Sequence, residues 1–505
     1  MAQTTTPSAA AASARRQRLD LRLSLAMLVI LLSGAALRLY GLDRTSLWND
    51  EAASWFAAHQ PFWNMIQATA NDNSPPLYNL ILYTTIRLFG DSEIALRLPS
   101  VIFAIANIYL LYRLGTVLWD RLTGVFAAAL LALSGFHLWY SQEARMYSLL
   151  SLAATAFALA TVQLLARPYW LRATLCTVAG MALLYSHIYG IFAWAGISAG
   201  ATAVLLTGAA WIAVDRKTWF AANGLAGVSF LPWVPEFLGQ AHRTVERFWI
   251  PFPTPRFLYF MSVSIAGGTA MLGCLVVLTL LSFLRAPASD QQTEGASAQP
   301  ATRPVVSLPP LSFELGWQNI ILLTWGLVPL LIGYAISIIG RPILFDRYLI
   351  GSLPALMLLG ARGLRVLCFN RLVLAGAFAA LLACSIPVLY SDLTTKMRED
   401  HRAAVAAFAG RFRSTDEVVF LSPGLTNSFS YYFRAPVEHK VVIDSSAVDN
   451  VDLRNAPRIW IFVRLEAAGQ IAKLFERIEV SYMREQEFHF YDVATYLYVR
   501  RPHSP

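Results

Sequence analysis

Charged residues are scarce in this sequence, and cysteines are few. Only 14% of the 505 residues are charged and 56% are hydrophobic, whereas soluble domains carry about 25% charged residues. This shortage of charge excludes an ordinary soluble globular protein, because the excess apolar surface has to be solvated by lipid. The cysteines show no metal-type spacing and lie in or beside apolar segments, which indicates packing residues instead of a disulfide framework or a thiolate site. They are Cys176, Cys274, Cys368 and Cys384.

The net charge of +9 raises the question of a nucleic-acid partner. The positions of the basic residues argue against one, because outside the C-terminal region most Arg and Lys residues lie between long apolar runs. That distribution is typical of the signals that orient membrane helices. We therefore interpret the basic balance as membrane orientation, and we expect no nucleic-acid partner.

Apolar segments long enough to cross a bilayer recur along the chain. A helix needs about 20 residues to cross the hydrocarbon core, and by that measure we count about eleven spans. They begin near Leu21, Ala95, Leu122, Tyr147, Trp170, Ile188, Trp219, Phe257, Trp317, Tyr348 and Leu372. Residues 1–20 form an Ala-, Thr- and Ser-rich tail that we expect to be disordered and cytoplasmic. The first apolar run could be a cleaved secretory signal, but the further spans favour an uncleaved helix.

Every proposed inner loop is basic, as the positive-inside rule requires. The residues concerned are Arg113, Arg121, Arg167, Arg172, Arg216, Lys217, Arg285, Arg303, Arg362, Arg365 and Arg371. One of these loops, 285–314, is rich in Pro, Ala, Ser and Gln and is typical of a flexible cytoplasmic linker. In the first outer loop, 41–94, the apolar segment Leu77–Phe89 has only about 13 residues, which favours a helix lying in the membrane interface. The alternative, a short tilted span, would invert every later loop.

The composition changes after the last span. Residues 401–412 have helical periodicity, several short β-rich runs follow, and a second helix is expected from about Glu466 to Glu476. The β-rich runs are Val418–Leu421, Val441–Ile443, Ile459–Val463 and Tyr496–Val499. We therefore expect residues 21–391 to form an all-α polytopic membrane domain, and residues 392–505 to form a small α/β domain. An odd number of spans starting in the cytoplasm places this second domain outside the plasma (inner) membrane, on the periplasmic or extracellular side.

An acidic pair, Asp50 and Glu51, lies in the first outer loop between Trp48 and Trp55. A carboxylate held at the membrane surface by interfacial aromatic residues can act as a general base. Asn49 and Asp50 are also good N-cap residues, so a solvated acidic pair that caps a surface helix explains the pattern equally well. The spacing alone leaves both interpretations open.

Two polar residues later in the same loop, Asn73 and Ser74, precede Pro75 and Pro76. The prolines fix an extended turn from which these polar groups could be presented. A plain entry into the following helix explains the prolines on its own.

Three further polar residues, Glu143, Arg145 and Tyr147, lie at the mouth of a proposed span. Unpaired charge is costly there, so such residues are usually functional or paired. Residues two positions apart on a helix do not face each other. We therefore expect Glu143 and Arg145 to have separate partners.

The remaining outer loops supply a histidine and an arginine. His187 lies in a very short turn, and a lone histidine is more often structural than a ligand or a phosphate contact. Arg347 and Tyr348 open the helix of the tenth proposed span, where an arginine beside a helix N-terminus can bind an anionic phosphate headgroup. The alternative for Arg347 is a salt bridge with Asp346 or with another outer-loop carboxylate.

Taken together, the outer loops offer carboxylates, two arginines, a histidine and tyrosines around a lipid-embedded body. This set suits a reaction on a negatively charged lipid headgroup. One carboxylate would deprotonate an acceptor hydroxyl, and the arginines would stabilise a departing phosphate.

Several short motifs also occur in a characteristic order. They are Arg38-Leu-Tyr-Gly-Leu, Trp48-Asn-Asp-Glu-Ala, Ser74-Pro-Pro-Leu-Tyr, Ala95-Leu-Arg-Leu-Pro-Ser, Ser141-Gln-Glu-Ala-Arg-Met-Tyr-Ser and Asp346-Arg-Tyr-Leu. In this order and placement the chain resembles the GT-C superfamily of membrane glycosyltransferases, near the protein O-mannosyltransferases and the lipid A aminoarabinose transferases. The resemblance covers about Arg38 to Val366, and the C-terminal domain resembles the periplasmic extensions of bacterial members.

The resemblance implies transfer of a sugar from a polyprenyl-phosphate sugar to an acceptor outside the cytoplasm, without a nucleotide donor. The acceptor would be a cell-envelope glycan, a lipid or a protein. The acidic pair of the family matches Asp50 and Glu51, with Asp50 as the expected catalytic base in an inverting displacement. The basic residues that bind the lipid phosphate match Arg145 and Arg347.

The resemblance adds secondary roles and one departure. Tyr348 would donate a hydrogen bond to the phosphate and His187 would assist, while further substrate-site candidates are Arg38, Asn73, Glu143 and Tyr147. No cofactor is required, although some relatives hold a divalent metal, for which Glu143 and His187 would be the ligands here. Members often have His where Ser74 stands in this chain, which puts a direct role of this loop in doubt.

Two other classes of function compete with this interpretation. A transporter or a flippase for lipid-linked sugars needs charges near the middle of the bilayer and often has paired repeats. The proposed spans are nearly free of interior charge, and the polar set lies at one surface. In the third class, a binding or assembly protein, the C-terminal domain would be the functional part and the outer-loop site would be inert.

Overall fold

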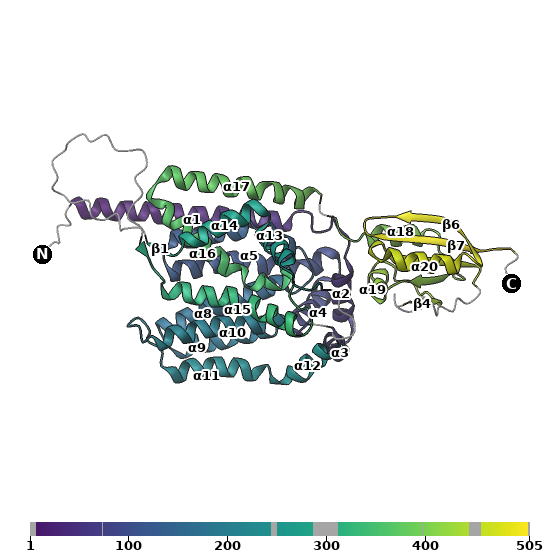
Figure 1. Ribbon diagram of the computed structural model, residues 1–505, viewed down its shortest axis with the longest axis horizontal. Coiled ribbons are helices and arrows are strands. Elements are labelled where there is room, and N and C mark those ends of the chain that lie inside the picture. The colour runs from purple at the N-terminus through teal and green to yellow at the C-terminus, as the bar shows by residue number, and fades with distance from the viewer. Residues whose placement is uncertain are drawn as a thin grey trace.

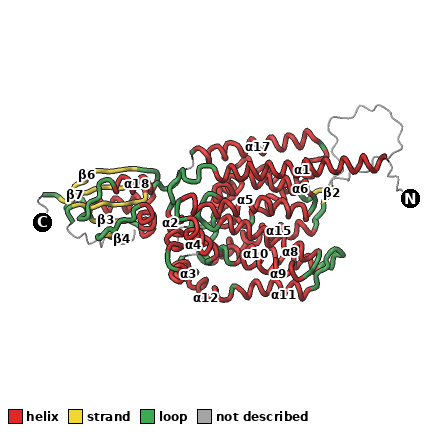
Figure 2. Tube along the Cα trace, turned by 180° about the vertical axis from the view of Figure 1, so that it is seen from behind, coloured by secondary structure: helices red, strands yellow, loops and turns green. Residues whose placement is uncertain are grey.

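The computed structural model divides into a helical bundle and a smaller α/β domain attached to one end of it (Figure 1). It describes residues 7–72, 74–243, 250–285, 312–395, 397–443 and 456–502. Helices fill the bundle, and strands gather in the C-terminal domain (Figure 2). The predicted fold class, a helical membrane body with a small C-terminal α/β domain, is confirmed.

The bundle contains helices of very different lengths. In chain order they are α1 (Pro7–Leu39), α2 (Asn49–His59), α3 (Phe62–Asn71), α4 (Leu77–Phe89), α5 (Glu93–Leu118), α6 (Arg121–Ala132), α7 (Gly135–Ser141), α8 (Tyr147–Ala166), α9 (Trp170–Leu184), α10 (Ile188–Leu206), α11 (Arg216–Ser229), η1 (Leu231–Trp233), α12 (Val234–Arg243), α13 (Pro255–Ala266), α14 (Thr269–Leu281), α15 (Trp317–Ile339), η2 (Asp346–Gly351), α16 (Leu353–Val366), η3 (Leu367–Phe369) and α17 (Arg371–Thr394).

Every expected span start falls within one of these helices. Among the described residues, six helices are long and apolar enough to cross a membrane, or up to eight if each of two bent pairs, α6–α7 and α13–α14, is one span. The bends, 63° and 83°, divide these pairs into pieces too short to qualify alone. The chain is thus a multi-pass membrane protein, and the count of eleven stays a prediction.

The predicted helix Leu77–Phe89 is present as α4 with the same bounds, and its place in the membrane interface stays a prediction. It lies with α2 and α3 at the end of the bundle that faces the C-terminal domain (Figure 1). Gly90, at φ 77°, follows it in a backbone conformation that favours glycine and ends the helix.

The N-terminal region differs from the expectation of disorder. Helix α1 begins at Pro7 and continues without a break into the first apolar segment. The alanine-rich stretch has high intrinsic helix propensity, and the following span supplies a helix onto which it can propagate. Of the expected linker 285–314, residues 286–311 lie outside the described residues. On either side, β1 (Leu284–Arg285) and β2 (Ser312–Phe313) pair antiparallel.

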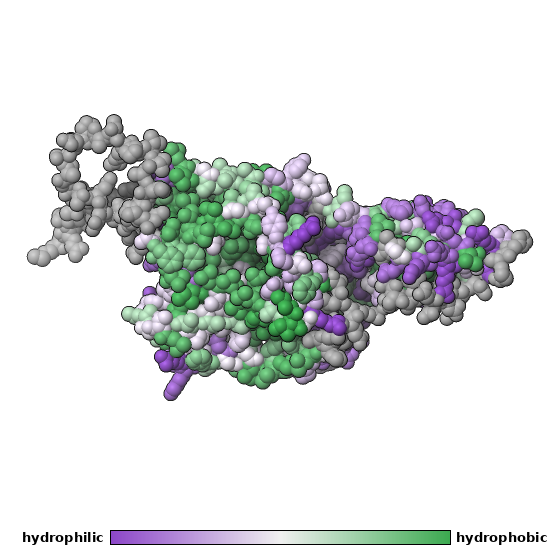
Figure 3. All heavy atoms as spheres, viewed as in Figure 1, coloured by the Kyte–Doolittle hydropathy of each residue, from purple (hydrophilic) through white to green (hydrophobic). Residues whose placement is uncertain are grey.

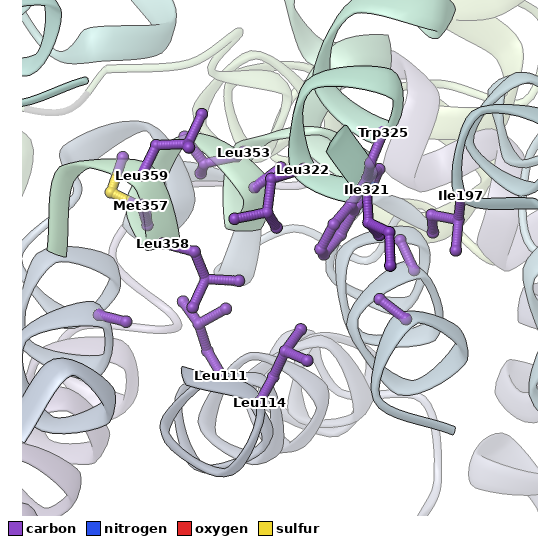
Figure 4. Packing of buried hydrophobic residues seen from close by; sticks show 14 of the residues in the cluster. Leu111, Leu114, Ile197, Ile321, Leu322, Trp325, Leu353, Met357, Leu358 and Leu359 are labelled. Carbon is purple, nitrogen blue, oxygen red and sulfur yellow. The ribbon is translucent and has the colours of Figure 1, made fainter. Parts of the chain in front are cut away.

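The interior of the bundle is packed with aliphatic side chains. Leu111 and Leu114 of α5 lie close to Leu358 of α16, and Trp325 of α15 lies between the groups from α16 and Ile197 of α10 (Figure 4). The face of the bundle seen in Figure 3 is largely hydrophobic as well, whereas hydrophilic residues dominate the described surface of the C-terminal domain in the same view. A surface of this kind requires lipid around the helices.

The C-terminal domain is a five-stranded sheet with helices on both faces. Its elements are α18 (His401–Ala409), β3 (Glu417–Phe420), α19 (Pro423–Tyr432), β4 (Lys440–Val442), β5 (Arg458–Arg464), η5 (Leu465–Ala467), α20 (Ala468–Ile478), β6 (Tyr482–His489) and β7 (Val493–Arg500). The strand order is β4-β3-β5-β7-β6, with β4, β3 and β5 parallel and β7 antiparallel to both β5 and β6.

Alternation along β5 explains the two helical layers. Ile459 and Ile461 pack with Leu474 of α20, whereas Trp460 and Phe462 pack with α18 and α19 on the other face. The four expected β-rich runs and both expected helices are present. The sequence interpretation missed α19 and β6. Strand β6 lies at the edge of the sheet, and its charged, exposed side chains lack the alternation of apolar and polar residues by which a strand is predicted.

We predict that Gly124→Leu destabilises the bundle. A Cβ at Gly124 would lie 2.4 Å from the backbone oxygen of Tyr112, so α5 and α6 would have to separate. Overpacking of this kind costs about 1–3 kcal/mol. The thermal unfolding midpoint of the detergent-solubilised protein should therefore fall. Gly376→Leu on α17 is the matched control, because a Cβ there meets nothing within 4 Å; equal midpoints for the two variants would contradict this packing.

Candidate functional site

The acidic pair of the first outer loop lies in the first turn of α2. This helix lies at the junction between the bundle and the C-terminal domain (Figure 1). Because neighbouring residues of a helix point about 100° apart, Asp50 and Glu51 enter different surroundings. The side chain of Asp50 is 34% exposed, whereas that of Glu51 is 0% exposed.

Asp50 faces Arg347, which lies in the 3-10 turn η2. The distance between Arg347 Nη2 and Asp50 Oδ2 is 3.6 Å, and the Arg347 side chain is largely buried. The neighbouring Asp346 accepts hydrogen bonds from the Arg347 backbone amide and from Ser264 Oγ instead. Of the two salt-bridge partners left open by the sequence, the structure thus shows another outer-loop carboxylate, Asp50.

Aromatic rings surround the Arg347 guanidinium. Its central carbon lies 5.3–5.8 Å from the ring centroids of Trp48, Tyr147, Phe345 and Tyr348. Cation–π attraction to these rings favours the charged guanidinium in this position. Arg347 is therefore a fixed cation beside a partly exposed carboxylate.

A second cation, Arg145, approaches Asp50 from the loop between α7 and α8. Its Nη1 donates to the Asp50 backbone oxygen at 3.2 Å and to Ser54 Oγ at 3.0 Å, and lies 3.7 Å from Asp72 Oδ2. Burial opposes its charge, but the carboxylates of Asp50 and Asp72 outweigh burial and raise the pKa of Arg145 above its ordinary value. Arg145 thus stays charged at the edge of the site.

His187 is the N-cap of α10, where its Nδ1 accepts the Tyr189 backbone amide at 3.0 Å. Its ring lies 5.0 Å from that of Tyr348 and 6.0 Å from that of Tyr147. Burial, assisted by Arg145 and Arg347, lowers the pKa of His187 to about 3. The imidazole is therefore neutral, and its place in the site is that of a cap packed against two tyrosines, not of a cation.

Glu51 is the centre of a buried ion-pair network. Arg97 of α5 donates to both of its oxygens, at 2.8 Å from Nε and 2.6 Å from Nη2. The Ala144 amide adds a hydrogen bond at 2.8 Å, and Arg398 Nη1 lies 3.5 Å away. Burial alone would raise the pKa of Glu51, but these partners outweigh it and lower the pKa. The oxygens of Glu51 are thus engaged by buried partners, whereas Asp50 is the more exposed carboxylate of the acidic pair.

Glu143 belongs to the same network. Arg398 Nη2 donates to Glu143 Oε1 at 2.7 Å, and both side chains are buried. Arg145 instead contacts Asp72. The expectation that Glu143 and Arg145 have separate partners is thus confirmed. Two carboxylates and two guanidinium groups, from Glu51, Glu143, Arg97 and Arg398, balance each other's charge.

The turn after α3 contributes one carboxylate to the open site. Ser74 Oγ donates to Asp72 Oδ2 at 3.4 Å, and Asp72 in turn contacts Arg145. Asn73, a substrate-site candidate from the sequence, lies outside the described residues. The other candidate at this edge, Tyr147, is buried at the start of α8 and packs against Arg347.

Arg38 does not join this cluster, contrary to the expectation of a substrate contact. It is fully buried in α1 and donates to the backbone oxygens of Leu131 and Ala132 at the end of α6. Its Nη2 lies 2.9 Å from His137 Nδ1. A cation at a helix C-terminus satisfies carbonyls that lack an intrahelical partner. Arg38 therefore stabilises the break between α6 and α7.

The suggested metal ligands do not form a common site. Glu143 is bonded to Arg398, and His187 Nδ1 is occupied by a backbone amide. Among the residues that the structure describes, no group of three or more His, Cys, Asp or Glu side chains is arranged to hold a metal ion. The residues present therefore do not fit a metal, and we derive no chemical step through one.

Three charged residues of the site were not predicted. Arg97 lies within the motif Ala95-Leu-Arg-Leu-Pro-Ser, and Asp72 lies two residues before the motif Ser74-Pro-Pro-Leu-Tyr. Arg97 pairs with Glu51 and Asp72 with Arg145, and these pairs are visible only in the structure. Arg398 follows the last span in a stretch with no recognisable pattern, and its partners are far away in the sequence.

A family model described as dolichyl-phosphate-mannose-protein mannosyltransferase matches residues 73–235, which is less than half of the chain. A search of curated proteins finds no match. Among solved structures, the chain is similar to ArnT from Cupriavidus metallidurans bound to undecaprenyl phosphate, with 13% identity, a TM-score of 0.57 and coverage of 95% of this chain and 98% of that chain. The apo state of ArnT gives 12% identity, a TM-score of 0.56 and coverage of 96% and 98%. The Archaeoglobus fulgidus oligosaccharyltransferase in complex with Zn and sulfate gives 11% identity, a TM-score of 0.50 and coverage of 93% and 72%.

The likeness to ArnT extends over nearly the whole of both chains, so it includes the C-terminal domain as well as the bundle. At such low identity it establishes the fold. The chain therefore has the GT-C fold, and the resemblance to the GT-C superfamily of membrane glycosyltransferases seen in its sequence motifs is supported by this fold and by the family-model match over residues 73–235.

Proposed function

We propose that this protein transfers a sugar from a polyprenyl-phosphate-linked donor to a hydroxyl group of an extracytoplasmic acceptor, with inversion at the anomeric carbon. The observation that carries the proposal is the surroundings of Asp50. The partly exposed carboxylate of Asp50 pairs with Arg347, and the backbone oxygen of the same residue accepts a hydrogen bond from Arg145, which also pairs with Asp72; both arginines are mostly buried, at one end of a GT-C bundle. A base and two phosphate-binding cations are the groups that such a transfer needs.

In the proposed step, Asp50 removes the proton from the acceptor hydroxyl as its oxygen attacks the anomeric carbon. The bond between that carbon and the phosphate oxygen breaks, and polyprenyl phosphate leaves with the bonding electron pair. Arg347 and Arg145 stabilise the negative charge that develops on the leaving group. Their donor-rich guanidinium groups suit the geometry of phosphate oxygens.

The related proteins support the class of donor. ArnT from Cupriavidus metallidurans is described as bound to undecaprenyl phosphate, and the matching family model is named for a dolichyl-phosphate-linked sugar. We therefore assign a polyprenyl phosphate to the donor, in a cell membrane with the N-terminus in the cytoplasm and the C-terminal domain outside. The acceptor would be an envelope glycan, a lipid or a protein.

The competing flippase class is disfavoured by the position of the charges. Arg38 and Arg97, both buried, lie near the ends of their spans that face the C-terminal domain. A transport pathway needs polar groups near the middle of the bilayer. Purified protein in liposomes, supplied with labelled polyprenyl-phosphate sugars and envelope fractions, separates the classes: transfer of label to an acceptor supports the proposal, and movement of intact donor across the bilayer refutes it.

The first test concerns the base. Asp50→Asn removes the proton acceptor and should lower the transfer rate at least about a hundredfold, as general acid–base catalysis contributes about 10²–10⁴-fold. Initial rates with labelled donor measure this, and thermal unfolding checks that the fold is kept. Asp43→Asn, an exposed aspartate of the same loop, should keep the wild-type rate. Near-normal turnover by Asp50→Asn would remove Asp50 from the mechanism.

The second test concerns the cation. Arg347→Met keeps the apolar stem but removes the charge, and should raise the donor KM about tenfold, which corresponds to about 1.4 kcal/mol. The acceptor KM should stay close to that of the wild type. The control is Arg341→Met, an exposed arginine of the same loop. A larger effect on the acceptor than on the donor would exclude the phosphate role.

A third test asks whether His187 acts as a neutral N-cap of α10 or as a cation that binds the donor phosphate. The folded-state pKa of His187, about 3, lies below the ordinary value, so the side chain is neutral from about pH 5 upwards. His187→Asn, which keeps an N-cap acceptor, should therefore leave the donor KM and its pH dependence between pH 5 and 8 nearly unchanged. A donor KM raised as much as in Arg347→Met would show that the histidine carries charge to the phosphate.

A further inference from the structure

Two consecutive charged residues are buried where the chain passes from α17 into the C-terminal domain. The side chains of Arg398 and Glu399 are only 4% and 7% exposed. Burying an unpaired charge is costly, so each needs partners. Both find them in α2, the helix that carries Asp50.

Arg398 binds Glu51, the residue that follows Asp50 in the sequence. Its guanidinium lies 3.5 Å from Glu51 Oε2 and donates to Glu143 at 2.7 Å. Together with Arg97, it neutralises the two buried carboxylates. Arg398 therefore ties the residue after Asp50 to the interdomain segment.

Glu399 binds Asn49, the residue that precedes Asp50 in the sequence. Its Oε2 accepts the backbone amide of Asn49 at 3.0 Å, one of the first amides of α2, which have no partner within the helix. The same oxygen lies 2.8 Å from His401 Nε2, and Oε1 lies 2.7 Å from Nη2 of Arg464, the last residue of β5. Burial alone would raise the pKa of Glu399, but His401, Arg464 and the Asn49 amide outweigh it and lower the pKa. A carboxylate held ionised at a helix N-terminus stabilises that helix.

The residues on either side of Asp50, Asn49 and Glu51, are thus bound by two consecutive residues of the interdomain segment. Asn49 is bound by Glu399 and Glu51 by Arg398, and α19 packs directly against α2, where a side chain in place of Gly424 would collide with Asn49. Some contacts between the domains do not involve α2. Arg402, for example, donates to the backbone oxygens of Asp43 and Thr45 ahead of the helix.

We propose that Arg398 and Glu399 are positioning residues of the site, through which the C-terminal domain fixes the first turn of α2 so that Asp50 faces Arg347. The proposal rests on the proposed function. Neither residue touches the reacting atoms, so loss of either should lower kcat and leave the donor phosphate contact intact. The C-terminal domain is thereby a working part of the transferase.

The chain offers a matched pair for the experiment. Glu399 and Glu466 both pair with Arg464 Nη2, at 2.7 Å and 2.8 Å, but only Glu399 also reaches α2. Glu399→Gln should lower kcat about tenfold or more, with a donor KM within about twofold of wild type; in free energy a tenfold rate change is about 1.4 kcal/mol. Glu466→Gln should leave both parameters within about twofold.

A second pair tests the arginine. Arg398→Met should lower kcat in the same way, and Arg398→Lys should recover part of it, because a lysine restores the charge without the forked geometry. Arg402→Met, which removes an interface arginine that does not contact α2, is the control. A loss of kcat in Arg402→Met equal to that in Arg398→Met would show a general effect of the interface and overturn the proposal.

Hydrogen exchange gives a readout that does not depend on activity. In Glu399→Gln, but not in Glu466→Gln, the backbone amides of α2 should exchange faster, since the helix loses the negative charge at its N-terminus and the neutral amide oxygen of glutamine is a weaker acceptor. Unchanged exchange in α2, or a raised donor KM in place of a lowered kcat, would overturn the positioning role. Absence of transfer by the wild-type protein would instead refute the proposed function, and exchange in α2 would still decide whether Glu399 holds the helix.

Discussion

A carboxylate buried at the end of a helical bundle has to be neutralised where it stands, and Glu51 meets this condition with partners from three parts of the chain. Arg97 comes from α5, the Ala144 amide from the loop before α8, and Arg398 from the segment leading to the C-terminal domain. Breaking a buried pair by removing one partner typically costs about 3–5 kcal/mol. The network therefore holds together the first outer loop, the bundle and the C-terminal domain.

The two members of the acidic pair are adjacent in the first turn of α2 but lie in different surroundings. Glu51 points inward and its oxygens are engaged, whereas Asp50 is partly exposed and meets Arg347 at 3.6 Å, a looser contact. A base needs an accessible carboxylate whose ion pair can be exchanged for a substrate. Glu51 is held rigidly by its buried partners, and Asp50 keeps the exposure that its proposed role as the base requires.

Much of the architecture could be predicted from local pattern. The eleven expected span starts fall on helices, and α4 has the predicted bounds, because apolar run length and helix signals are local properties. The breaks within α6–α7 and α13–α14 were not foreseen, and neither was the role of Arg38 at the first of them. That role depends on carbonyls nearly a hundred residues away.

The site could be predicted in part as well. The sequence pointed to Asp50, Arg145 and Arg347, but Arg398 could not be found, since its partners Glu51 and Glu143 lie more than 250 residues earlier.

Trp48 connects the buried network with the open site. Its ring lies 5.5 Å from the Arg347 guanidinium and 6.0 Å from that of Arg398, so one indole contacts both the cation assigned to the donor phosphate and the cation that holds Glu51. Because Trp48 is also the N-cap residue of α2, a shift of this helix would move the ring and the acidic pair together. The interfacial tryptophan that first suggested a membrane-surface site thus lies between Arg347 and the buried ion-pair network around Glu51.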